Sequence, residues 1–333
     1  MNRNNDFIYD AVSKLESLTQ THIEIDSKRK EYDATLTIKE ERLNIIAKSA
    51  IRDSNIGMVL TPFVNKTNNE KATILLVAKY ISKSSAYLLK DNNLNYLDAS
   101  GNAFIKKDGI FIFIEGQKGD KYDKDHSRAF QEAGLKLMLL LLSKPESLEC
   151  SYRELSEKTD ISIGSVSNIF TELEDLNFIL RTKQKRTIKN KKDLIERWVI
   201  AYNDVLKPRI LRKRMKFSEY VDFKTVKNLA DKDNVVWGGE SAVSTLVNDF
   251  YPENFMLYSN EEVGTLSQKF GLSADPNGNV EIREFFWKFN NETISAPPLV
   301  VYADLISSGF ERNIEIAKII FENELLPNNK ESK

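Results

Sequence analysis

Residues 162–186 read SIGSVSNIFTELEDLNFILRTKQKR, and this stretch decides the fold of the middle of the chain. Ser162 stands where a helix N-cap belongs. Apolar residues then recur at helical spacing, namely Val166, Ile169, Phe170, Leu173 and Leu176. Phe178 and Ile179 follow as the start of a strand. The pattern predicts a helix over 163–176 that buries one face and leaves a polar face outside.

Two further helical patterns precede this helix, over 128–143 and 151–159. Three helices followed by a strand is the element order of a winged helix-turn-helix, which places its last helix in the major groove of DNA. The polar face then offers small hydrogen-bonding side chains as candidate base readers: Ser162, Ser165, Ser167, Asn168 and Thr171. Asn168 is the one residue among them that can bind adenine through two hydrogen bonds.

The strand leads into a run of positive charge. Residues 181–192 contain seven cationic side chains and no acid, whereas the whole chain has a net charge of only −1. A basic wing beside a recognition helix would neutralise phosphates and give salt-dependent binding that is insensitive to sequence. The candidate phosphate contacts are Arg181, Lys183, Lys185, Arg186 and Lys189, with Lys191 and Lys192 beyond them.

A second basic cluster lies at 207–216 and is expected to extend the same surface. Its members are Lys207, Arg209, Arg212, Lys213, Arg214 and Lys216. The plain alternative is that both clusters are solvated faces, because charge runs usually are. Winged helices also serve as protein-interaction modules, so an adaptor that binds only protein stays open.

Length and composition predict several domains. With 333 residues, of which 41% are apolar, the chain exceeds the size at which one core stops growing. We expect a mixed α/β domain at 1–118, a polar linker at 119–127, the winged helix-turn-helix at 128–194 and an α+β domain at 195–333. The fold class is therefore α+β multidomain.

The first of these domains has a regular order of patterns. A helix is expected at 6–19, a hairpin through 23–38, a buried strand within 72–81 and a helix at 83–91. Short strands follow, separated by the Gly101-Asn102 and Asp108-Gly109 turns. In the last domain, the Gly238-Gly239 pair predicts a tight turn before a helix, and residues 297–325 predict a closing helix.

Segments in all of these domains resemble a known family. They are LLVAKYIS (75–82), NYLDASGNAFI (95–105), IFIEGQK (112–118), YRELSEKTDISIGSVSNIFTEL (152–173), WGGESAV (237–243) and VYADLISSGFERNIEIAKIIF (301–321). The chain is similar to the antitoxins of type IV toxin-antitoxin systems, of the abortive-infection E class, which are winged-helix transcriptional regulators. The resemblance implies a bacterial, cytoplasmic protein that binds double-stranded DNA, represses its own operon and counteracts a nucleotidyltransferase-type toxin.

The first domain also looks like the restriction-endonuclease class, in which carboxylates bind a metal and a lysine activates water. Asp33 and Lys48 are candidates, but Ile46 stands where that motif needs an acid. A second candidate set is Asp98, Glu115, Gln117 and Lys118. An acid in a turn such as Asp98-Ala-Ser-Gly-Asn typically caps the turn amides instead. We therefore expect a nuclease-like domain without activity; the alternative is a metal-dependent nuclease targeted by the winged helix.

Other classes are disfavoured by what the sequence contains. One cysteine, Cys150, and two histidines exclude a disulfide framework and a Cys/His zinc site. The amino-terminal residues do not resemble a signal peptide, and the longest apolar run, at 137–142, is too short to cross a bilayer. We expect a cytoplasmic regulator with no membrane partner, no cofactor and no enzymatic activity. The oligomeric state is open, and a homodimer would match a two-fold operator.

Overall fold

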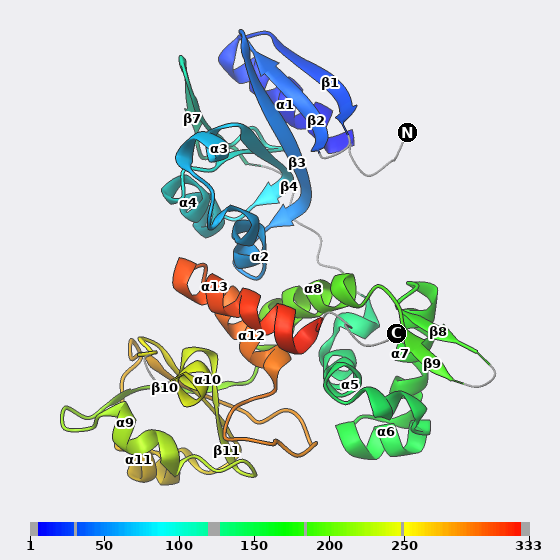
Figure 1. The fold of residues 1–333 in the computed structure, drawn as a ribbon, viewed down its shortest axis with the longest axis vertical. Coiled ribbons are helices and arrows are strands. Elements are labelled where there is room, and N and C mark those ends of the chain that lie inside the picture. Colours follow the sequence, from blue (N-terminus) through cyan, green and yellow to red (C-terminus); the bar gives the residue numbers. More distant parts are fainter. Residues whose placement is uncertain (1–5, 30–31, 119–126, 183–184, 248–249, 328–333) are drawn as a thin grey trace. The chain divides into compact units, whose positions relative to one another are not determined.

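The computed structural model describes residues 6–29, 32–118, 127–182, 185–247 and 250–327 (Figure 1). The chain divides into two compact units, Met1–Lys124 and Asp125–Lys333. It is an α+β multidomain protein, as the sequence predicts. Except for Ser127, the residues of the expected linker lie outside the described ones. None of the described helices is both long enough and apolar enough to cross a membrane.

The first unit is built on one mixed sheet whose seven described strands neighbour one another in chain order. The outer groups, β1 to β3 and β5 to β7, pair antiparallel, while β3, β4 and β5 pair parallel. The strands are β1 (Ile23–Arg29), β2 (Tyr32–Ile38), β3 (Glu41–Ile51), β4 (Ile74–Ile81), β5 (Asn95–Asp98), β6 (Ala103–Lys107) and β7 (Ile110–Ile114). The expected hairpin is confirmed, with Ile23 opposite Ile38.

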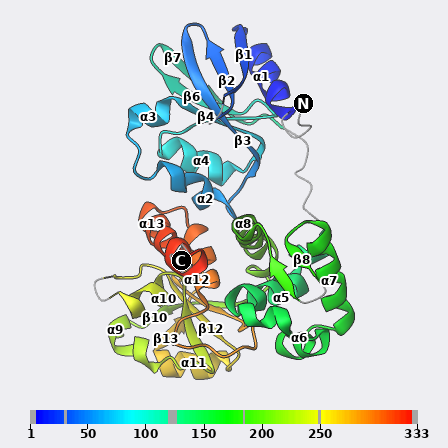
Figure 2. The same ribbon diagram turned by 45° about the vertical axis from the view of Figure 1, so that its right-hand side comes forward.

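Helices cover both faces of this sheet (Figure 2). They are α1 (Asp6–Thr19), α2 (Ile56–Leu60), η1 (Thr61–Phe63), α3 (Asn68–Ala72) and α4 (Lys83–Asp91). Leu75 and Val77 of β4 belong to the cluster that packs on α1, whereas Leu76 between them points to the opposite face and is also fully buried. A strand buried on both faces needs a continuous apolar run, which is why ILLVA stands at the centre of the sheet.

The second unit begins with short helices packed on one another. They are η2 (Arg128–Phe130), α5 (Glu132–Ser143), η3 (Pro145–Glu149), α6 (Tyr152–Thr159) and α7 (Ile163–Asp175). A capping box starts α6, because the Ser151 hydroxyl accepts from the Glu154 amide at 3.3 Å and the Glu154 carboxylate accepts from the Ser151 amide at 2.7 Å. The antiparallel hairpin of β8 (Ile179–Arg181) and β9 (Arg186–Ile188) follows.

A second mixed sheet completes this unit, with strand order β11-β12-β14-β10-β13 among the described residues. Its strands are β10 (Leu211–Phe217), β11 (Val235–Gly238), β12 (Phe255–Ser259), β13 (Leu272–Ala274) and β14 (Val280–Arg283). The helices of this part are α8 (Lys191–Ala201), η4 (Tyr202–Leu206), α9 (Phe223–Val226), η5 (Lys227–Leu229), α10 (Gly239–Leu246), α11 (Val263–Phe270), α12 (Pro298–Ile306), α13 (Glu311–Ile320) and η6 (Phe321–Leu325).

The closing helix expected over 297–325 is wrong as one element. It is two helices, α12 and α13, because the chain turns between them at Gly309, whose φ of 72° is readily adopted only by glycine. The tight turn expected at Gly238-Gly239 is confirmed: β11 ends at Gly238 and α10 begins at Gly239.

Helix α8 joins the α5–α7 segment to the second sheet. The Trp198 indole donates a hydrogen bond to the Leu135 carbonyl of α5 at 3.0 Å, and its ring stacks on Tyr202 at 5.0 Å between centroids. Both side chains are fully buried. Tyr202 in turn contacts Tyr258 of β12 at 2.6 Å between hydroxyl oxygens. Helix α8 and η4, which continues it, thus pack against both parts of the unit.

Gly238 gives a direct test of this packing. A Cβ at position 238 would lie 2.4 Å from the ring of Tyr258, which is fully buried and cannot yield. We expect Gly238→Ala to destabilise the second unit by about 1–3 kcal/mol. All three tryptophans, Trp198, Trp237 and Trp287, lie in that unit, so urea denaturation followed by tryptophan fluorescence isolates it.

The matched control is Gly264→Ala in α11. A Cβ there meets nothing within 4 Å, and alanine is the better helix former by up to about 1 kcal/mol. Gly264→Ala should leave the denaturation midpoint unchanged or raise it. Equal midpoints for the two variants would contradict the close approach at Gly238.

Candidate nucleic-acid interface

The outer face of α7 is neutral and hydrogen-bonding. Gly164, Asn168 and Thr171 are exposed, while Ser165 and Ser167 are half-buried. The Asn168 amide makes no hydrogen bond within the described part of the chain, so its donor and acceptor are both available. The opposite face carries the buried residues Val166, Ile169, Phe170 and Leu173, which fix the helix against its neighbours.

Ser162 caps α7 as the sequence predicts. Its hydroxyl accepts from the Ser165 amide at 3.1 Å and lies 2.9 Å from the Ser165 hydroxyl. Thr171 donates to the Ser167 carbonyl at 3.1 Å. The hydroxyls of Ser162, Ser165 and Thr171 therefore bond within the helix itself, whereas the Ser167 hydroxyl and the Asn168 side chain have no hydrogen-bond partner in the described part of the chain.

The sequence pattern singled out only polar residues of α7 as candidates for base contacts and missed an exposed apolar residue. Ile163, the first residue of α7, is 51% exposed and lies at the amino end of the helix, at the edge of the outer face. Ile163 is exposed, and the surroundings of its neighbour Gly164 are open. Ile163 can therefore make an apolar contact with a partner group such as the methyl group of thymine. In the sequence Ile163 continues the apolar spacing of Val166 and Phe170, and its exposure follows from its place in the first turn of the helix.

The acids at the end of α7 are partly used inside the protein. The Glu172 carboxylate accepts from the Ser127 hydroxyl and, at 2.9 Å, from the Ala129 amide, so it caps the start of η2. Glu172 and Glu174 are half-buried, and Asp175 is exposed. The negative charge at this end of the helix is thus turned mainly toward the packed interior, away from the amino-terminal half of the outer face.

The β8–β9 hairpin presents Arg181, Lys185 and Lys189 as exposed side chains. We call these three residues the basic hairpin. Its turn is closed by hydrogen bonds from the Thr182 amide to the Lys185 carbonyl at 2.9 Å and from the Lys185 amide to the Thr182 hydroxyl at 3.1 Å. Lys183, also expected to contact phosphate, lies outside the described residues.

Arg186 differs from this expectation because its side chain points inward. One guanidinium nitrogen donates to the Cys150 carbonyl at 2.6 Å, and the guanidinium lies over the rings of Phe170 at 4.8 Å and Tyr152 at 5.3 Å. Those two rings are stacked on each other at 5.2 Å. Arg186 therefore holds the hairpin against α6 and α7. The sequence did not reveal this, because an arginine inside a cationic run looks like its neighbours.

The second basic cluster is dispersed along β10 and just before it, and most of its charges are paired. Lys207 bonds to Asp304 at 3.0 Å, Arg214 to Glu281 at 2.5 Å and Lys216 to Asp275 at 3.3 Å. Arg212 donates to the carbonyls of Ser259 and Glu261, and Arg209 lies 3.9 Å from Glu132. Lys213 is exposed and has no ion pair among the described residues. Most charges of this cluster thus form ion pairs or hydrogen bonds with other residues of the second unit, although several of the side chains are exposed.

In the first unit, the nuclease candidates occupy structural positions. The Asp98 carboxylate accepts from the amides of Ser100 and Asn102 at 2.9 Å and from the Asn102 side chain at 2.8 Å. Burial raises the pKa of Asp98, against the lowering by these hydrogen bonds. The Gln117 amide donates to the Asn102 side chain at 2.8 Å. This network closes the turn, which is the structural role that the turn sequence indicates.

The remaining candidates are not gathered around a metal position. Asp33 on β2 accepts from the Ala47 amide of β3 at 2.8 Å, and Lys48 follows on β3. Glu115 and Lys118 are exposed beyond the end of β7. Among the described residues, no group of three or more His, Cys, Asp or Glu side chains is arranged to hold a metal ion.

Comparison with known families bears on the second unit. Residues 186–326 match the family described as the AbiEi antitoxin, a transcriptional regulator of a type IV toxin-antitoxin system. Over this range, which is less than half of the chain, the second unit is similar to the AbiEi antitoxin family. The match begins in β9 and spans α8, η4 and the whole second sheet, so it includes both Trp198 and Tyr202. Neither the curated proteins nor the solved structures gave a match.

Arg181 lies opposite Arg186 in the hairpin register, so a variant of Arg181 is a matched control for a variant of the inward-pointing Arg186. Arg186→Ala removes a hydrogen bond and two ring contacts, and we expect it to destabilise the second unit by about 1–3 kcal/mol. Arg181→Ala changes an exposed side chain and should stay within about 0.5 kcal/mol of the parent. Urea denaturation monitored by tryptophan fluorescence compares them. Equal losses would show that Arg186 is as free as Arg181.

Proposed function

We propose that α5, α6, α7 and the β8–β9 hairpin form a winged helix-turn-helix that binds double-stranded DNA. The observation that carries the proposal is the separation of charge within the second unit: most cations near β10 are paired, while Arg181, Lys185 and Lys189 of the basic hairpin are exposed beside a neutral outer face of α7. An exposed cationic strand pair next to a polar helix face suits phosphate contacts on one side and base contacts on the other.

The orientation follows from the distribution of side chains along α7. Its first half presents Ile163, Gly164 and Asn168, and the uncompensated amides of a helix amino terminus favour a phosphate nearby. The acids lie at its other end. We therefore place the amino-terminal half of α7 in the major groove, with Asn168 as a reader of adenine and Ile163 against a thymine methyl group.

The family of the second unit supports a regulatory role for this binding. We propose that the chain is a type IV antitoxin that represses its own operon and counteracts a nucleotidyltransferase-type toxin. In this proposal the first unit is a nuclease-like domain without catalysis, since the Asp98 carboxylate is committed to its turn and Asp33 to the Ala47 amide. If the chain does not bind DNA, that result favours the alternative function as a protein-interaction adaptor.

The basic hairpin provides the first test. Changing Lys185 and Lys189 to Ala should weaken binding to selected and random-sequence duplexes alike. It should also flatten the plot of log affinity against log salt by about 0.9 for each phosphate that is no longer neutralised. Gel shift or fluorescence anisotropy over a salt series measures both. The control is Lys213→Ala, an exposed lysine of the same unit, which should leave the affinity and the salt slope unchanged.

Asn168→Ala separates base reading from phosphate binding. Without its two hydrogen bonds to a base, the variant should lose about 1–3 kcal/mol of affinity for the selected duplex and little for random DNA. Binding that survives the hairpin changes with its salt slope intact would contradict the proposed interface. Complete absence of DNA binding at low salt would favour the adaptor.

A further inference from the structure

A polar cavity of about 430 Å³ lies in the second unit, away from the proposed DNA interface. Its walls come from β10, β12 and β14, from the start of α10 and from the ends of α12 and α13 that face each other. The volume is within the range of small-molecule sites in proteins. About half of its lining residues carry charged or amide side chains.

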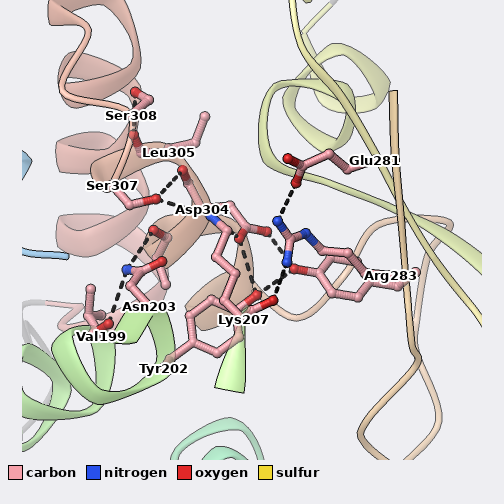
Figure 3. A network of polar contacts seen from close by, with 12 residues as sticks. Val199, Tyr202, Asn203, Lys207, Glu281, Arg283, Asp304, Leu305, Ser307 and Ser308 are labelled. Atoms are coloured by element: carbon pink, nitrogen blue, oxygen red, sulfur yellow. Dashed lines mark hydrogen bonds and ion pairs between the residues drawn. The ribbon is translucent and has the colours of Figure 1, made fainter. Parts of the chain in front are cut away.

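Four ionisable residues of one connected network line this cavity, and two buried tyrosines lie behind them. We call Tyr202, Lys207, Tyr258, Glu281, Arg283 and Asp304 the buried polar network (Figure 3). Asp304 accepts from Tyr258 at 2.8 Å and from Tyr202 at 3.2 Å, and pairs with Lys207 at 3.0 Å. Burial, followed by the charge of Asp304, holds the pKa of both tyrosines well above the ordinary value, so both remain neutral donors.

The charges of the network do not balance at Glu281. Asp304 is matched by Lys207, but the single carboxylate of Glu281 is shared by two guanidinium groups, those of Arg283 and Arg214. Burial would raise the pKa of Glu281, yet Arg283 and Arg214 keep it below its ordinary value, so the carboxylate is charged. The triplet therefore has an excess of one positive charge, and Glu240, the remaining carboxylate of the cavity lining, is paired with Arg312 at 2.9 Å.

Two buried polar atoms at the cavity have no partner among the described residues. They are Nε of Arg283, whose side chain is 6% exposed, and the amide oxygen Oδ1 of Asn313, which is 1% exposed. Buried donors and acceptors are nearly always satisfied, and an exception calls for an explanation such as a bound group. Both residues line the cavity, and Nε of Arg283 is the one of the two atoms from which an anion could accept, after a shift of the side chains that now shield it from solvent.

We propose that this cavity binds a small anionic molecule through Arg214 and Arg283, with a phosphate or carboxylate group as the recognised chemistry. An anion would neutralise the excess charge of the Arg214–Glu281–Arg283 triplet and accept from guanidinium donors, which is the strongest class of hydrogen bond in proteins. Arg214 is 47% exposed and can move toward a ligand, whereas Arg283 is fixed by the Lys207 carbonyl and Glu281. The site does not depend on DNA binding.

Arg214→Gln tests the site, and Lys213→Gln, the adjacent exposed residue on β10, is the matched control. Because phosphate also stabilises proteins by exclusion from their surfaces, the readout is the difference between variants. The urea midpoint of the full chain is followed by tryptophan fluorescence in rising inorganic phosphate against sodium chloride of equal ionic strength. A ligand that binds only the folded protein raises the free energy of unfolding, and once its concentration exceeds Kd this increase grows with the logarithm of the concentration.

The parent and Lys213→Gln should show a phosphate-specific rise in midpoint, and Arg214→Gln should need at least about tenfold more phosphate for the same rise. Repeating the series with adenosine monophosphate and with succinate tells a phosphate-bearing ligand from a carboxylate. Circular dichroism checks that Arg214→Gln is folded, and isothermal titration of the parent with phosphate supplies a readout independent of that variant. Equal midpoints in phosphate and chloride, or an unchanged response in folded Arg214→Gln, would overturn the proposal.

Discussion

The buried carboxylate of Asp304 is the constraint around which the second unit is arranged. Its side chain is fully shielded from water, and a buried charge is tolerated only when it is paired and hydrogen-bonded. The partners come from different elements: Tyr202 from η4, Lys207 from the turn after it and Tyr258 from β12. Removing one partner would leave a charge uncompensated in the interior, so the elements that supply them have to keep their places.

Gly238 packs closely against these same buried groups. A side chain at position 238 would meet the Tyr258 ring and approach Asp304 Oδ2 at 3.2 Å. The glycine lets the end of β11 and the start of α10 come close to the network, and this explains the Gly-Gly pair without any catalytic role. The matched family region contains the whole arrangement, from α8 to α13.

Helix α8 connects this interior to the proposed DNA interface. Trp198 packs on α5, Tyr202 reaches Asp304, and Arg197 lies over the rings of Phe130 and Phe178 at 4.3 and 5.5 Å. The pairing of cations near β10 leaves the basic hairpin as an exposed positive group in a chain that is almost neutral overall. The excess positive charge at the polar cavity is of a different kind, because there two arginines share one buried carboxylate.

Much of the local structure could be predicted from the sequence, because periodicity and capping are local properties. The N-cap at Ser162, the stripe of Val166 and Ile169, and a hairpin within 23–38 all appear in the structure. Which of the cations are exposed and which bind other residues of the protein could not be predicted. Arg186 and Lys207 each stand in a basic run, and only the fold brings Cys150 to the first and Asp304 to the second. The charge excess at Glu281 likewise arises from β10 and β14 lying side by side.

The central claim is that the first half of α7 and the basic hairpin contact DNA while the β10 cations do not. Hydrogen–deuterium exchange of the full chain, with and without a duplex selected from a random-sequence library, tests it most directly. We expect slower exchange on binding at 162–171 and in the hairpin, and unchanged exchange across 211–217. Protection confined to β10, or no change at α7 and the hairpin under conditions where the duplex is bound, would contradict it.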